Sequence, residues 1–128
     1  PFIDSEKLLE SISPFLHKND EIDTVSFIPR SIPGKSTHPK CQDELCHGLK
    51  IQYMENPINT TIHLFQVLAT LYPDKFQFME SNFIDKLYGS NALRLTVLSG
   101  EDVIQMILDW KIDLAKFHEM SKKYHLYK

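Results

Sequence analysis

The feature that most constrains the fold is a polar stretch, residues 30–44, that lies between two runs of alternating apolar and polar residues. It reads RSIPGKSTHPKCQDE, with two prolines, one glycine and almost no side chain to bury. The flanking runs, 25–28 and 49–54, repeat with a period of two, which predicts strands with one buried face. Long segments without regular structure are uncommon in compact domains and are often functional. We therefore predict a small antiparallel sheet of two or three strands, with the loop 30–44 as the functional candidate.

Apolar residues at helical spacing predict two helices around these strands. Asp4 and Ser5 can each cap the first helix, and Pro14 is expected to break or kink its end. Asn59 or Thr60 can cap the second, which follows the second strand. The apolar positions are Leu8, Leu9, Ile12 and Leu16 in the first helix, and Leu64, Phe65, Leu68, Leu71 and Tyr72 in the second, before Pro73.

Three further helices are predicted in the remaining sequence. A short one over 83–88 is followed by Gly89, a natural left-handed cap, and Asn91 can start another over 92–98. Ser99 and Asp102 then resemble a capping box before a long C-terminal helix. Its apolar stripe is expected to be core: Val103, Ile107, Trp110, Leu114 and Phe117. Together these elements predict an α+β fold in which several helices pack on a small antiparallel sheet.

Size and charge narrow the class of protein. A chain of 128 residues fits one domain, and we expect a single domain over 1–128. The net charge of -3, with Lys and Arg scattered, argues against a nucleic-acid partner. No apolar run is long enough to predict a membrane span. The chain begins with Pro1 rather than Met, so we expect it to have been processed or excised from a longer product.

Two cysteines and two histidines in and after the loop allow several kinds of chemistry. His38, Cys41, Cys46 and His47 could surround a zinc ion, but their spacing fits no standard finger, and we predict no metal site and no cofactor. A disulfide between the two cysteines is the second alternative, and independent thiols are favoured. Catalysis by Cys46 would need His47 or His38 as a base and a carboxylate such as Glu44, but adjacent strand residues point to opposite faces.

The charges of the loop suggest a ligand more than a catalyst. Arg30, Lys35 and Lys40 outnumber Asp43 and Glu44, which suits an anionic or polyhydroxylated ligand such as a sugar with a carboxylate. A solvated surface explains the same residues equally well. Glycosidase chemistry needs two carboxyl groups across a substrate, and no such pair is assigned here, so we predict no catalytic residue in this chain.

The chain resembles the C-terminal domain of the exo-β-N-acetylmuramidase family of the NamZ type, a bacterial family. Three stretches carry the resemblance: PFIDSEKL, FIPRSIPGKSTHPKCQDELCHGLKI and DWKIDLAKFHEMSKKYHLYK. The second is the more specific, because the family typically shows Gly-Glu-x-Cys-x-Gly-Val where this chain has Asp43-Glu44-Leu45-Cys46-His47-Gly48-Leu49. Asp43 stands where glycine is common, and Leu49 replaces valine.

The resemblance implies a peptidoglycan-processing enzyme that removes terminal N-acetylmuramic acid. A Rossmann-like N-terminal catalytic domain, outside this chain, would be the partner and would hold the catalytic carboxylates. This chain would be auxiliary, inactive alone, and would form one wall of the cleft against a peptidoglycan-derived muramic sugar. The implied location is bacterial and extracytoplasmic, either periplasmic, secreted or in the cell envelope. The expected sugar-binding residues are Arg30, Lys35, His38, Glu44, Cys46, His47 and Gly48.

Two other classes of function stay open on the sequence alone. The same loop could bind a glycan or a protein in a free-standing, non-catalytic module. Alternatively, Cys41 and Cys46 could define a small zinc or thiol protein, which would bind metal or present a reactive thiol.

Overall fold

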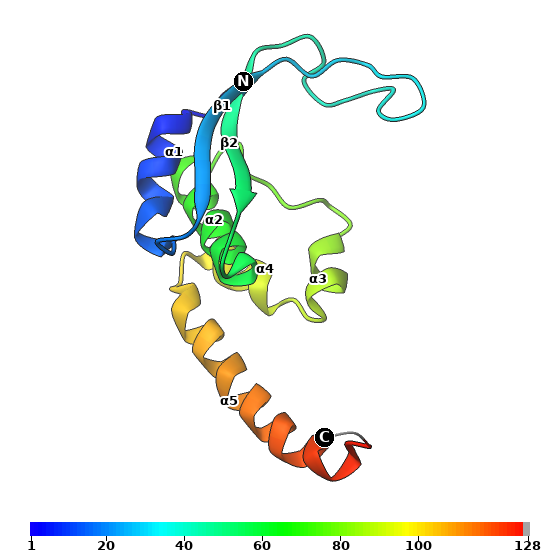
Figure 1. Cartoon of the computed structure of the whole chain (residues 1–128). Coiled ribbons are helices and arrows are strands. Elements are labelled where there is room, and N and C mark those ends of the chain that lie inside the picture. Colours follow the sequence, from blue (N-terminus) through cyan, green and yellow to red (C-terminus); the bar gives the residue numbers. More distant parts are fainter. Residues whose placement is uncertain (127–128) are drawn as a thin grey trace. The chain divides into compact units, whose positions relative to one another are not determined.

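A computed structural model describes residues 1–126, which form two compact units, one over Pro1–Leu71 and the other from Tyr72 onward (Figure 1). The first unit holds a two-stranded antiparallel sheet and two α-helices, and the second holds three α-helices that end with the longest helix of the chain. The predicted α+β class, the small antiparallel sheet and the long C-terminal helix are therefore confirmed. A single domain over 1–128 stays a prediction.

The sheet is a twisted ribbon of two strands joined by the long loop. Strand β1 spans Glu21–Phe27 and β2 spans Cys46–Tyr53, with Phe27 opposite Cys46 at the loop end and Glu21 opposite Tyr53 at the far end. Strand β1 begins earlier than the alternating run 25–28 predicted. The reason is that β1 has only one neighbouring strand and one face in contact with solvent. Such a strand can carry polar residues at positions where a buried strand would carry apolar ones.

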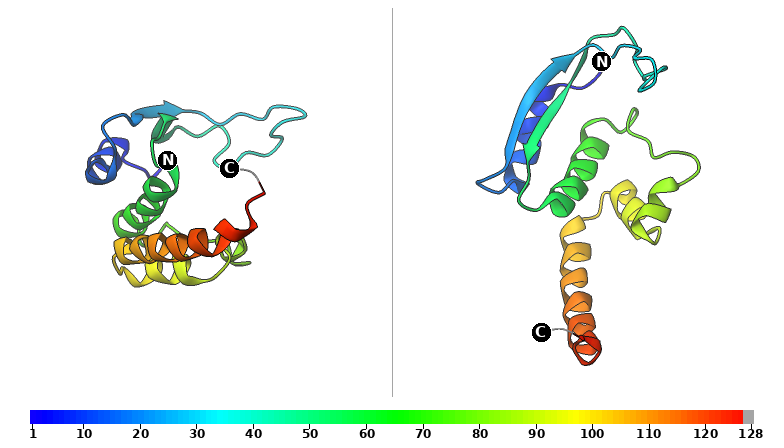
Figure 2. Two further views of the ribbon diagram at one scale, coloured as in Figure 1. Left: turned by 60° about the horizontal axis from the view of Figure 1, so that its bottom comes forward. Right: turned by 45° about the vertical axis from the view of Figure 1, so that its right-hand side comes forward.

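Two helices supply the packing that an isolated ribbon lacks. Helix α1 spans Ser5–Ile12 and contacts both strands and α2, which spans Pro57–Leu71 (Figures 1 and 2). Ile12, 1% exposed, lies at the centre of this contact. The core cluster is Leu8, Ile12 and Val67, and the half-buried residues around it include Leu9, Leu16, Leu49, Leu64 and Leu68.

The ends of both helices follow from local chemistry. Asp4 caps α1 by accepting a hydrogen bond from the backbone N–H of Lys7 at 3.0 Å, and Pro14 falls in the short 3-10 helix Ser13–Phe15 that follows. Both predictions for this helix are confirmed. The predicted cap of α2 is wrong, because Asn56 accepts from the N–H of Asn59 at 3.3 Å and the helix begins at Pro57. Proline is well suited to the first helical position, since its missing N–H would have no helical partner there.

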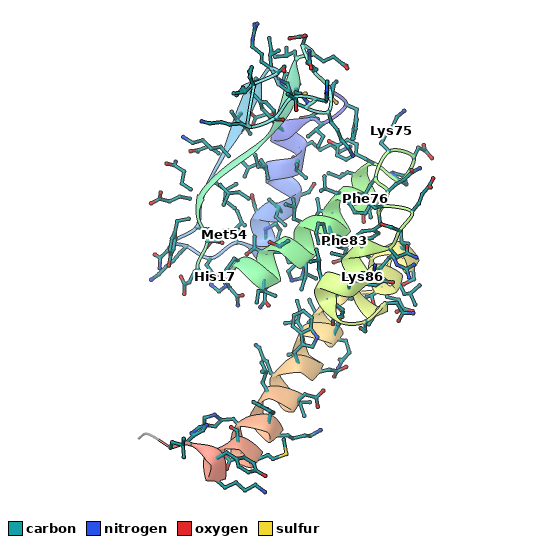
Figure 3. The ribbon with its side chains drawn as sticks, turned by 90° about the vertical axis from the view of Figure 1, so that its right-hand side faces the viewer. His17, Met54, Lys75, Phe76, Phe83 and Lys86 are labelled. Atoms are coloured by element: carbon teal, nitrogen blue, oxygen red, sulfur yellow. The ribbon has the colours of Figure 1, made fainter. Side chains whose placement is uncertain are left out.

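The ribbon end that lies away from the loop is closed by Asp20. Its carboxylate accepts the backbone N–H of Glu55 at 2.7 Å and that of His17 at 3.0 Å, so both chain segments at this end are tied to one side chain. Figure 3 shows His17 and Met54 at this end of the ribbon. The N–H of Glu55, followed by that of His17, lowers the pKa of Asp20 below its ordinary value because both bonds favour the ionised carboxylate.

The second unit joins three helices by specific side-chain contacts. Helix α3 spans Phe83–Tyr88 and α4 spans Ala92–Ser99, and they are linked by a two-pronged ion pair between Asp85 and Arg94, with N···O distances of 2.9 and 2.7 Å. Gly89, with a φ of 89°, ends α3 in the left-handed region as predicted. This ion pair fixes the turn between the two short helices.

Helix α5 spans Val103–Ser121 and continues into a 3-10 turn over Lys122–Tyr124. Its cap differs from the prediction, because Ser99 ends α4 and Asp102 alone caps α5 by accepting from the N–H of Ile104 at 2.8 Å. None of the helices described over residues 1–126 is long and apolar enough to cross a bilayer.

The apolar stripe of α5 is core in its first half and exposed in its second, which corrects the expectation of a continuous core stripe. Val103 and Ile107 are buried, and the indole N–H of the half-buried Trp110 donates to the hydroxyl of Tyr88 at 2.8 Å. By contrast, Leu114 and Phe117 are 65% and 59% exposed. Periodicity shows which residues share a helix face, but not whether another element covers that face.

Candidate functional site

The loop between β1 and β2 has a defined path with a closed base and a turn farther out. At the base, the N–H of Asp43 donates to the carbonyl of Pro29 at 2.9 Å. Farther along, Ile32 and Ser36 form an isolated antiparallel bridge around the Pro33-Gly34 turn. The loop extends beyond the end of the ribbon, away from α1 and α2 (Figure 1). It therefore presents its side chains from an ordered frame.

Three residues of this frame adopt left-handed backbone conformations. Gly34 has a φ of 76°, which costs glycine nothing sterically, while Cys41 and Asp43 have φ values of 53° and 62°. Residues with a Cβ atom rarely adopt this region, and Asp does so more readily than most because its short polar side chain can bond locally. The conformation of Asp43 explains physically why glycine would suit the same position in the resembling family.

The cations of the loop have no partner within the described chain. Arg30, Lys35 and Lys40 are exposed, and over residues 1–126 their side chains make no hydrogen bond or ion pair. His38 is also exposed. Their N–H groups are therefore available to donate hydrogen bonds to an anion or to the hydroxyl groups of a sugar.

The loop places these residues in two groups. Arg30 follows Pro29 and Glu44 follows Asp43, so both residues adjoin the hydrogen bond that closes the base of the loop. Lys35 lies at the outer turn, where its N–H donates to the carbonyl of Ile32. No direct contact joins the two groups among the described residues, so a ligand that touched both would have to span the loop.

Cys46 and His47 begin β2 and have different surroundings. Cys46 is 7% exposed, and its thiol donates a weak hydrogen bond to the carbonyl of Glu44 at 3.7 Å. His47 faces across the ribbon, where its Nδ1 lies 2.8 Å from the hydroxyl of Ser26. Neighbouring strand residues alternate between the two faces of a sheet, so His47 is not placed to act as a base for Cys46. The structure therefore favours a packing role for Cys46.

Gly48 pairs with Val25 within the ribbon and leaves open space beside its backbone. A Cβ atom added at Gly48 would have no atom within 4 Å, apart from its chain neighbours. Glycine inside a strand often marks a place where a ligand or another backbone approaches closely. Among residues 1–126 nothing fills the space beside Gly48, so this space is accessible to a ligand or to another polypeptide.

The metal and disulfide alternatives have no counterpart in the described residues. Cys41 is an exposed free thiol and Cys46 a buried free thiol. Among residues 1–126, no three His, Cys, Asp or Glu side chains are close enough together to hold a metal ion. The loop path thus places the two cysteines in different environments.

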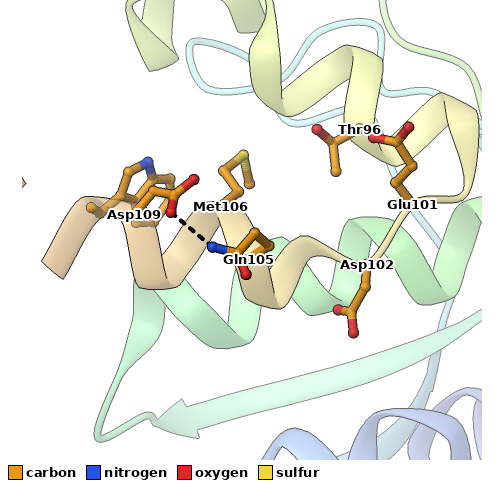
Figure 4. Close-up of a pocket in the computed structure, with 7 residues that line it drawn as sticks. Thr96, Glu101, Asp102, Gln105, Met106 and Asp109 are labelled. Carbon is orange, nitrogen blue, oxygen red and sulfur yellow. Dashed lines mark hydrogen bonds between the residues drawn. The ribbon is translucent and has the colours of Figure 1, made fainter. Parts of the chain in front are cut away.

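A hollow that the sequence did not predict lies beside the start of α5 and has a volume of about 260 Å³ (Figure 4). The sequence pattern that could have indicated this hollow is the helical spacing of Asp102, Gln105 and Asp109. In the structure a 2.8 Å hydrogen bond joins Gln105 and Asp109. The lining residues are Thr96, Glu101, Asp102, Gln105, Met106, Asp109 and Trp110.

The charge of this hollow distinguishes it from the loop. Glu101, Asp102 and Asp109 line it, and no Lys or Arg does. Ionised carboxylates repel an anionic ligand and favour a neutral or cationic one. Of the two places, the loop is therefore the one suited to a sugar that carries a carboxylate.

Comparisons with known proteins cover nearly the whole chain. The family model described as exo-β-N-acetylmuramidase NamZ, C-terminal, matches residues 1–127. The peptidoglycan β-N-acetylmuramidase NamZ of Bacillus subtilis (strain 168) is 28% identical over 131 aligned residues, which cover 99% of this chain and 30% of that protein. A crystal structure of a DUF1343 family protein from Bacteroides fragilis matches with a TM-score of 0.57 and 17% identity, covering 99% of this chain and 34% of the other. The match to the crystal structure shows a shared fold. This chain spans about a third of the length of either relative.

Proposed function

The chain belongs to the family of C-terminal domains of the exo-β-N-acetylmuramidase NamZ, and from this we propose that it is the auxiliary domain of a peptidoglycan-processing muramidase. The loop 30–44, with the start of β2, forms one wall of the substrate cleft and contacts a terminal muramic sugar. The catalytic carboxylates belong to an N-terminal domain of the same protein, so this chain is inactive alone. Its substrate places the protein at the bacterial cell envelope or outside the cytoplasm.

The observation that carries the proposal is the set of uncommitted cations on an ordered loop. Muramic acid differs from glucosamine by a lactyl group with a carboxylate, which a guanidinium or ammonium group can bind by a charge-assisted hydrogen bond. Arg30 lies at the closed base of the loop, and Lys35 at its outer turn. The acidic hollow beside α5 cannot supply this recognition, because its carboxylates would repel the lactyl group.

Three neutral features support binding at the same end of the ribbon. The open space beside Gly48 admits a ligand without moving the backbone. On the other face of the ribbon, His47 and Ser26 offer an imidazole and a hydroxyl that are 2.8 Å apart. Such groups bind sugar hydroxyls as donors or acceptors, whereas the closed thiol of Cys46 contributes packing.

The test uses the longer protein that carries this chain and a chromogenic N-acetylmuramide. Replacing both Arg30 and Lys35 with Ala should raise KM by up to about fivefold for each exposed ion pair with the substrate that is lost. The kcat should stay nearly unchanged, since the loop binds substrate without taking part in bond cleavage. Lys18→Ala is the matched control, because Lys18 is exposed at the other end of the ribbon. It should leave both constants unchanged.

Two results would count against the proposal. Turnover of the muramide by this chain alone would place catalytic groups here, contrary to an auxiliary role. Unchanged KM in the Arg30 and Lys35 variant would remove the loop from the substrate site and favour a free-standing glycan- or protein-binding module.

A further inference from the structure

The second half of α5 is exposed along its full circumference. Every residue from 111 to 120 is exposed, whereas Val103 and Ile107, near the start of the helix, are buried. Isolated helices shorter than about 12–15 residues are marginal in water, and most helical stability in proteins comes from packing of an apolar face. The exposed half of α5 has no such packing within its own unit, over the described residues 72–126.

The composition of this half is that of a covered helix. Leu114 and Phe117 continue, at spacings of four and three, the row that Val103, Ile107 and Trp110 begin. A second row of exposed apolar residues starts on another side of the first half of the helix and reaches the second half at its last member: Ile104, Leu108 and Ile112. A helix with apolar residues on more than one side is typical of the interior of a larger assembly.

We propose that the exposed face formed by Leu114 and Phe117 is the docking surface for the N-terminal catalytic domain of the same protein. This inference rests on the proposed function, because it takes its occupant from there. The length of the relatives supports that occupant: the matched region is 30% of one and 34% of the other, so each carries about twice as much additional chain as this one spans. The row that starts with the buried Val103 and Ile107 in α5 would then continue into an interface between domains.

The area of the face favours a tethered partner over a second copy of this chain. Leu114 and Phe117 are three positions apart and occupy about one turn of one helix. Such a face is much smaller than the roughly 800 Å² per partner that a stable complex between separate proteins buries. Domains of one chain associate through smaller contacts, because the covalent link raises the effective concentration of one for the other. A small face of this kind is therefore sufficient within one polypeptide.

The experiment compares amide hydrogen exchange of residues 111–121 in this chain and in the longer protein. We expect exchange to slow on the order of tenfold or more in the longer protein, because docking removes these amides from local opening. Leu114→Glu together with Phe117→Glu should abolish that slowing. In this chain alone the same variant should keep its melting temperature, because both side chains are already exposed. Leu87→Glu is the matched control, since Leu87 is 69% exposed on α3, and it should keep the slowing.

The outcomes separate this inference from the function on which it rests. A longer protein that hydrolyses the muramide but shows no slowing at 111–121 would overturn the docking surface and leave the muramidase function intact. Slowing that persists in the Leu114 and Phe117 variant would overturn it as well. Slowing that appears only at high concentration of this chain alone would assign the face to a second copy. A longer protein that shows the slowing but hydrolyses no muramide would refute the function and keep the interface.

Discussion

Asp43 provides a quantitative test of the loop frame, because its left-handed backbone has a predictable cost. A residue with a Cβ atom at a φ of 62° is disfavoured by about 1–2 kcal/mol, and glycine avoids this but is disfavoured by about 0.5–1 kcal/mol through its greater freedom when unfolded. The difference leaves Asp43→Ala less stable than Asp43→Gly by about 1 kcal/mol. Asp should lie between them because its short polar side chain reduces the penalty.

The assay is urea unfolding of the Gly, Asn and Ala variants of Asp43. A difference of about 1 kcal/mol shifts the midpoint by roughly 0.3–1 M for a small protein. Amide exchange of residue 43, whose N–H bonds to Pro29, reports local opening of the loop base in the same variants. Thr37→Ala is a control at an exposed loop position without a left-handed φ. Equal or higher stability of the Ala variant would refute the steric reasoning.

Three further predictions concern the two units. Ile12→Ala should reduce the free energy of unfolding by about 2–5 kcal/mol, because it leaves a cavity at a fully buried position, and urea unfolding measures this. A double-mutant cycle of Tyr88→Phe and Trp110→Phe should give a coupling of about 0.5–1.5 kcal/mol from their hydrogen bond. The two hydrogen bonds from Arg94 lower the pKa of Asp85 below its ordinary 3.8. The stability that this pair contributes is therefore present above pH 3.8 and is lost as the pH falls through the lowered pKa. Thermal melts of the parent across the acidic range should show this loss, and those of Asp85→Asn should not.

Each of these predictions has a contrary result. An Ile12→Ala variant as stable as the parent would mean that α1 does not pack as described. A coupling of zero would mean that the Tyr88 and Trp110 groups bond to water instead. An identical acid limb in the parent and in Asp85→Asn would show that the ion pair contributes nothing to folding.

The sequence predicted most of the fold because its periodic segments are strong and its turn residues agree with them. The first helix, the second strand, the Gly89 cap and the C-terminal helix follow from period and capping chemistry alone. The start of β1 was missed because Glu21 and Asp23 are polar residues on a strand with a solvated face. The start of α2 was missed because Pro57 was not recognised as a first helical residue.

The residues of the candidate site stay a prediction. The sequence selected the loop cations and the start of β2, and in the structure Arg30 and Lys35 are exposed. It could not predict that Cys46 would be buried while Cys41 is not, because burial of a thiol depends on the loop path. The spacing of apolar residues could not predict that Leu114 is exposed, because an apolar helix face can pack on a partner outside this chain.

The most direct test of the account is chemical-shift mapping of this chain, titrated with N-acetylmuramic acid and in parallel with N-acetylglucosamine, which lacks the lactyl carboxylate. We expect shifts confined to residues 30–48 that appear with the muramic sugar alone and vanish when Arg30 and Lys35 are both replaced by Ala. Shifts of equal size with both sugars, shifts centred on the acidic hollow beside α5, or no shifts at all would contradict a muramic-specific wall formed by this loop.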